Sequence, residues 1–121
     1  MLQIKRIYEA WDEADGRRVL VDRLWPRGVR KEVAHVDVWM KDVAPSPDLR
    51  TWFHHDVSRF PVFQVAYEKE LVEEETHRAA VKQLLHWLEQ GSVTLLYAAK
   101  DPLCNHAVVL RDYVRSQPLE G

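Results

Sequence analysis

The sequence has a single cysteine, no excess of basic charge and no long apolar run, and each of these shortages excludes a class of protein. Cys104 alone rules out an internal disulfide and a metal site built from several cysteines, which fits a reducing compartment. No segment approaches the roughly 18 apolar residues of a membrane span, and residues 1–6 lack the apolar stretch of a signal peptide. We therefore expect a soluble, cytoplasmic protein that has no membrane partner.

The charge balance argues against nucleic acid as a partner. The chain has 17 Lys and Arg against 19 Asp and Glu, for a net charge of -2, and the two signs are interspersed. No basic stripe of the kind that neutralises a phosphate backbone is visible. A length of 121 residues with 46% hydrophobic content is sufficient for one core, so residues 1–121 are predicted to form a single domain.

Three segments are predicted to be strands. Residues 3–8 alternate between apolar and polar side chains. Residues 18–21 are apolar and β-branched and lie between Gly16 and Pro26, which is typical of a buried central strand. Residues 93–97 form another short apolar run.

Four segments are predicted to be helices. Ser46 is expected to cap a helix that continues to about residue 54, and a second helix follows through about residue 74. Thr76 is expected to cap a third helix that ends at Gly91, and the last helix spans residues 105–116. The first helix is expected to bury Leu49, Trp52 and Phe53. Residues 23–43 show no clean period and are predicted to be a long connection with one short helix.

This order of elements predicts an α/β fold with a small, mostly parallel sheet of about three strands flanked by helices. The link between the first two strands is short for a crossover. A hairpin between the first and second strands is therefore an alternative, and the direction of the first strand stays open.

Two loops contain the polar residues that can support chemistry. The first follows the strand at residues 18–21 and runs from Asp22 to Gly28. The second follows the strand at residues 93–97 and runs to Asn105 at the start of the last helix. If the strands are parallel, both loops lie at the carboxyl edge of the sheet, where α/β proteins bind ligands, and they enclose a cleft.

Cationic side chains in these loops predict an anionic small molecule as the partner. Guanidinium groups bind phosphate or carboxylate bidentately, and an indole can stack on a ring. A carboxylate held beside cations stays ionised and can accept a proton, so Asp22 and Asp101 are the candidates for acid–base catalysis. The candidate ligand-binding residues are Arg23, Trp25, Arg27, Gly28, Lys41, Ser46, Tyr97, Lys100 and Asn105.

Structural roles compete with these functional ones. Asp22 and Arg23 can form a simple ion pair, Trp25 and Pro26 a packed turn, and Asn105 an ordinary helix cap. Ser46 also fits a cap better than a nucleophile. Adjacent His54 and His55 point about 100 degrees apart on a helix, so no metal site is expected. Cys104 and His106 diverge at a helix start and carry little weight as a nucleophile and base.

Taken together, several segments resemble the YeaO-like family of small bacterial proteins, a domain of unknown function. The most distinctive is the run Arg18-Val-Leu-Val-Asp-Arg-Leu-Trp-Pro-Arg-Gly28. Residues 39–46, 49–53, 67–71 and 93–107 add to the resemblance, which covers nearly the whole chain. The resemblance implies that the polar positions of both loops belong to the family motifs, but it implies no activity and no cofactor.

Three functions fit these observations. The leading hypothesis is a small-molecule site for an anionic metabolite or a nucleotide, with hydrolysis or group transfer as the reaction if one occurs. The alternative is a regulatory module that uses the same loops for recognition only. A protein-interaction role, in which the tryptophan-rich surface mediates oligomerisation, is the third.

Overall fold

The chain forms an α/β fold with a four-stranded, all-parallel sheet flanked by helices in a computed structural model that describes residues 1–118. The elements are β1 (Leu2–Arg6), η1 (Glu13–Asp15), β2 (Arg17–Leu20), α1 (Lys31–Ala34), β3 (Val38–Trp39), η2 (Lys41–Val43), α2 (Pro47–Phe53), η3 (Val57–Arg59), α3 (Phe60–Glu73), α4 (Glu75–Gln90), β4 (Val93–Tyr97) and α5 (His106–Ser116).

The strand order is β1-β4-β2-β3, so the last strand of the chain lies between the first two. β4 pairs in parallel with both β1 and β2, and all five of its residues are buried. The hairpin between the first and second strands is therefore wrong, because β4 separates them. The parallel direction of β1 resolves the question that the sequence left open.

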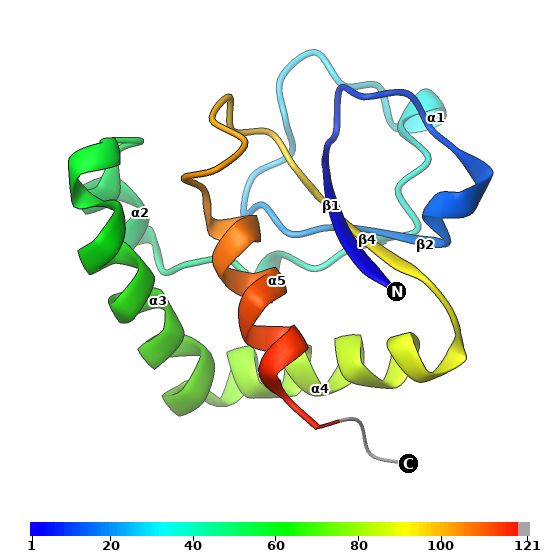
Figure 1. Ribbon diagram of the computed structural model, residues 1–121. Coiled ribbons are helices and arrows are strands. Elements are labelled where there is room, and N and C mark those ends of the chain that lie inside the picture. The colour runs from blue at the N-terminus through cyan, green and yellow to red at the C-terminus, as the bar shows by residue number, and fades with distance from the viewer. Residues whose placement is uncertain (119–121) are drawn as a thin grey trace.

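The two faces of the sheet are covered differently. Val19, Val21 and Leu95 point to a large core that also contains buried residues of α3, α4 and α5. Leu20 and Leu96 point to the opposite face, where they pack under the irregular segment that includes Trp25 and Val36. Figure 1 shows α5 beside the strands, with α3 and α4 meeting at a sharp corner.

Local capping signals predicted most of the helices correctly. Ser46 caps α2, with its Oγ accepting from the Leu49 N–H at 3.3 Å, and Asn105 caps α5. The Thr76 cap is wrong, since α4 begins at Glu75 after a single extended residue, Glu74, that makes no side-chain cap. Trp52 is also not buried as predicted: it is 41% exposed, with its ring under the Arg59 guanidinium.

The region between β2 and α2 contains a strand that the sequence pattern did not reveal. β3 has only two residues and pairs with Val19 and Leu20 at the edge of the sheet. The expected short helix is present as α1. Within residues 1–118, no helix combines the length and the apolar character needed to cross a bilayer.

Candidate functional site

The two loops chosen from the sequence are in direct contact at the carboxyl edge of the sheet. Asp22 lies two residues beyond the end of β2, and Ala98 follows the last residue of β4. Asp22 Oδ2 accepts a hydrogen bond from the Ala98 N–H at 3.0 Å. Parallel pairing of β2 with β4 brings the two loops together, as the sequence analysis expected for parallel strands.

The chain leaves β2 and β4 toward opposite faces of the sheet. The segment after β2 covers the face of Leu20 and Leu96, whereas α5, which follows β4, packs on the other face. Such a switch between neighbouring parallel strands is where open α/β sheets bind ligands. Asp22 lies at this switch point.

His106, which the sequence analysis considered only as a partner of Cys104, faces Asp22 instead. Its Nε2 lies 2.9 Å from Asp22 Oδ1 and 3.2 Å from the carbonyl oxygen of Val21. Both oxygens are acceptors, so Nε2 carries a proton in this arrangement. The Nε2–H is directed at the Val21 carbonyl, and buried Asp22 Oδ1 has no well-directed hydrogen bond among the described residues.

Two arginines at this edge are held in place by backbone carbonyls. Arg6 ends β1 and donates from Nε and Nη2 to the carbonyls of Ala99 and Ala98, at 2.9 and 3.1 Å. Arg23 donates from the same two nitrogens to the carbonyls of Pro45 and Ala44, at 3.2 to 3.4 Å. In both guanidiniums Nη1 has no hydrogen bond to another described residue. The simple ion pair between Asp22 and Arg23 is also not found among residues 1–118.

The remaining cations of the prediction differ in their surroundings. Lys100 and Arg27 are exposed, and neither side chain bonds to another described residue. The Arg27 carbonyl accepts from the Tyr8 hydroxyl at 3.1 Å. Lys41 is exposed and its Nζ lies 4.9 Å from the centre of the Trp39 ring.

Trp25 and Gly28 lie in the segment after β2, which covers the face of Leu20 and Leu96. Trp25 Nε1 donates to the Val29 carbonyl at 2.7 Å, and its ring meets Trp39 edge-on at 5.5 Å. Gly28 has a φ of +74°, and a side chain added there would meet open space. Trp25 is thus part of the core on this face.

The side chains of Asp101 and Asn105 shape the loop that joins β4 to α5. Asp101 Oδ1 accepts from the backbone N–H groups of Leu103 and Cys104, and these hydrogen bonds hold the pKa of Asp101 below its ordinary value of 3.8. Asn105 is buried; its Oδ1 accepts from the Val108 N–H and its Nδ2 donates to the Asp101 carbonyl. A carboxylate stabilised in this way is a weak base at neutral pH.

Tyr97 and Ser46 are also engaged within the protein. Tyr97 is buried at the end of β4, and burial raises the pKa of its hydroxyl above 10.0. The Ser46 N–H and hydroxyl donate to the two carboxylate oxygens of Glu70 in α3, at 2.9 and 2.6 Å. Ser46 therefore joins α2 to α3 besides capping α2.

Two surface hollows among the described residues have neither Asp22 nor His106 in their walls. One of about 380 Å³ is formed by the segments 7–11, 28–30 and 33–35 together with Arg18. The other, of about 430 Å³, lies between β3 and α4 and has Lys41 in its wall. Of the predicted site residues, Gly28 lines the first hollow and Lys41 the second.

Comparison with protein families places the chain in a class. The family described as "Inactive DUF488-N3 subclade" matches residues 1–120, and the chain belongs to this family. The similarity to YeaO-like proteins that the sequence motifs indicated is confirmed by individual relatives.

The chain is 42% identical to the uncharacterized protein YeaO of Escherichia coli over 115 residues, which cover 95% of this chain and 97% of that relative. It is equally identical to the uncharacterized protein Rv3073c of Mycobacterium tuberculosis over 109 residues, which cover 90% and 89% of the two chains. No solved structure matches.

Proposed function

We propose that the protein is a recognition module that binds an anionic small molecule at the carboxyl edge of its sheet, without catalysing a reaction. The observation that carries this proposal is the pair of anchored guanidiniums, Arg6 and Arg23, whose Nη1 groups make no bond within residues 1–118. A guanidinium that is already oriented loses little conformational freedom when it binds phosphate or carboxylate.

The charges around these two arginines add to their attraction for an anion. Arg6 bonds to the loop that contains Lys100, which is exposed and makes no side-chain hydrogen bond within residues 1–118. Arg27 lies in the loop that begins at Asp22. Both are exposed, so they extend the positive field without a desolvation penalty.

Three observations support recognition without catalysis. The family to which the chain belongs is described as an inactive subclade. One oxygen of Asp22 accepts from Ala98 while the other faces His106. The Asp101 carboxylate is stabilised by two backbone N–H groups, which makes it a poor proton acceptor. Both proposed bases are therefore engaged with groups of the protein itself.

A thermal-shift screen of nucleotides, sugar phosphates and organic acids tests the proposal. We expect at least one anionic compound to raise the melting temperature, because a ligand at 100 times its Kd stabilises the folded state by about 2.7 kcal/mol. Lys100→Ala and Arg27→Ala are expected to weaken binding by about two- to fivefold each. Neither side chain has a hydrogen bond or ion pair within residues 1–118, and both are exposed, so the fold should survive.

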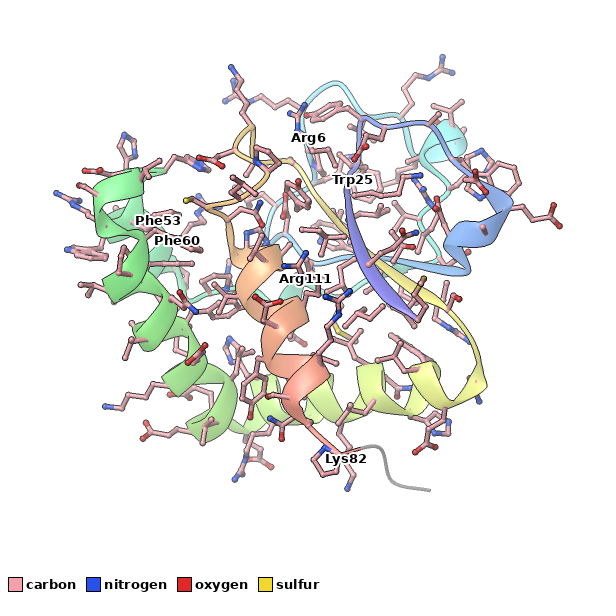
Figure 2. The ribbon with its side chains drawn as sticks, in the orientation of Figure 1. Arg6, Trp25, Phe53, Phe60, Lys82 and Arg111 are labelled. Carbon is pink, nitrogen blue, oxygen red and sulfur yellow. The ribbon has the colours of Figure 1, made fainter. Side chains whose placement is uncertain are left out.

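Lys82→Ala is the matched control for Lys100→Ala. Lys82 is also exposed, but it lies on α4 at the opposite end of the molecule from Arg6 (Figure 2). The control should bind like the wild type. We call the proposed site at the carboxyl edge of the sheet the edge site. It would be contradicted if a compound raised the melting temperature of the wild type and all three variants equally, or if no anion in the panel bound.

Asp22→Asn separates recognition from catalysis. The amide oxygen of Asn can still accept from the Ala98 N–H, so binding should be retained. Incubation of each binding compound with the wild type, followed by NMR, should show no product. Conversion of the compound by the wild type and its loss in Asp22→Asn would establish an enzyme and overturn the non-catalytic part of the proposal.

A further inference from the structure

The hollow on the face of Leu20 and Leu96 has aromatic walls that the edge site does not use. Tyr8 and Trp11 line it, and each is 51% exposed. Its volume of about 380 Å³ falls in the range of small-molecule sites. Half-exposed aromatic side chains that line a concavity offer flat apolar surface to a ligand.

Both aromatic rings are held in place before any ligand arrives. Trp11 stacks on His35, with ring centres 5.0 Å apart and planes inclined by 21°. Tyr8 packs under the Arg6 guanidinium at 4.8 Å, and its hydroxyl donates to the Arg27 carbonyl. Because these contacts fix the rings, a planar ligand can stack on them with little loss of side-chain entropy.

The walls of the hollow also supply polar groups. Arg30 is exposed at one side, and buried Arg18 is among the lining residues. The carboxylate of Glu9 and the ring of His35 can hydrogen-bond to the edge of a heterocycle. This mixture of stacking surface and hydrogen-bonding groups suits a heteroaromatic ring better than a purely apolar one.

Arg6 connects the hollow to the edge site. One side of its guanidinium covers the Tyr8 ring, and its Nε and Nη2 donate to the loop after β4. A ligand whose ring occupies the hollow can therefore place an anionic group beside Arg6. Tyr8, which lines the hollow and lies under Arg6, is the link between the two.

We infer that the ligand is nucleotide-like, with a heteroaromatic ring that stacks in the hollow of Tyr8 and Trp11 and an anionic group that binds Arg6. Binding of the anionic group to Arg6 rests on the proposed function. Stacking of the heteroaromatic ring rests on the hollow alone.

The experiment uses the four ribonucleoside 5′-monophosphates, the matching nucleosides and ribose 5-phosphate, added to ¹⁵N-labelled protein. The indole N–H signals of the five tryptophans report separately on each ring, and the spectrum of Trp11→Ala assigns the Trp11 signal. We expect at least one nucleotide to shift that signal. The signals of Trp25 and Trp39, whose indoles donate to Val29 and Asp22, should move less.

Trp11→Ala and Trp52→Ala form a matched pair of variants. Both tryptophans are about half exposed and pack against one polar neighbour, but Trp52 lies on α2 beside Arg59, outside the hollow. Loss of a stacking ring should weaken nucleotide binding about tenfold in Trp11→Ala, and Trp52→Ala should bind like the wild type. Equal losses in the two variants, or binding that leaves the Trp11 signal in place, would overturn the inference.

Ribose 5-phosphate distinguishes failure of the inference from failure of the proposed function. Ribose 5-phosphate binds in a way that depends on Lys100 if the edge site is correct. If it does so while no nucleoside or nucleotide shifts the Trp11 signal, the ring site is overturned and the edge site is kept. Nucleosides that shift Trp11 as strongly as their monophosphates would support the ring site and count against the edge site. If none of the compounds binds, both proposals fail.

Discussion

Among single residues, Asp15 is the clearest case in which charge and burial act together. It is 2% exposed, and its carboxylate bonds to Lys5 at 3.0 Å and to the equally buried Arg18. Burial alone would raise the pKa of Asp15, but hydrogen bonds from Lys5, from the Asp12 N–H and from Arg18 hold it below 3.8. The ionised carboxylate therefore stabilises the folded state.

This pKa shift predicts how stability depends on pH. Since the folded-state pKa is below the unfolded value, the stabilisation is complete above about pH 5 and is lost as pH falls through the folded-state pKa. Asp15→Asn should cost about 3–5 kcal/mol at pH 7, because it leaves Arg18 buried without a counter-charge. Urea denaturation should show that the difference in free energy of unfolding between the wild type and the variant becomes smaller from pH 5 to pH 2. A difference that is constant over this range would contradict the prediction.

The residues that the sequence analysis missed are those whose roles depend on distant pairing. Arg6 bonds to carbonyls more than 90 positions away, and it reaches them only because β1 pairs with β4. His106 faces Asp22 because α5 begins beside the end of β2. No spacing along the chain records either contact. Asp22, by contrast, was chosen from the sequence because it directly follows the strand predicted at residues 18–21.

At the scale of the elements, two glycines that both have a positive φ should respond differently to substitution. Gly16 joins η1 to β2 with a φ of +65°, and a β-carbon there would lie 2.2 Å from the Ser92 carbonyl oxygen. Gly28 has a φ of +74° but faces open space. Gly28→Ala should therefore cost about 1 kcal/mol, from backbone strain alone.

Gly16→Ala should cost about 1–3 kcal/mol more than Gly28→Ala, because β2 or the segment before β4 must shift to relieve the clash. Chemical denaturation of the two variants measures the difference directly, and Gly28→Ala serves as the control for a residue with positive φ. Equal destabilisation would show that the contact with Ser92 is easily relaxed.

Elements were predicted from sequence where their signals are local. Ser46 and Asn105 cap their helices through hydrogen bonds to residues three positions away, so the sequence marks both starts. β3 has no such signal, since its two residues are a strand only through their pairing with Val19 and Leu20. Trp52 was expected in the core on helical spacing, but α2 is short and its outer side faces Arg59.

At the scale of the whole molecule, the sheet order implies a gradient of local stability. β4 is central, completely buried and paired on both sides. β3 is an edge strand of two residues, and the neighbouring α1 has four residues, of which only Ala34 is buried. Segments with few buried contacts open without unfolding the rest of a protein.

Amide hydrogen exchange should reveal this gradient. We expect the amides of residues 94–97 to exchange only through global unfolding, with protection equal to the free energy measured by denaturation. Amides of α1 and β3 should exchange through local opening and be insensitive to mild denaturant. Added nucleotide should protect the segment around Trp11 and Gly28 if the hollow binds it, and leave β4 unchanged. Equal protection of β3 and β4 would mean that the irregular segment unfolds only together with the helix-covered face, as one cooperative unit.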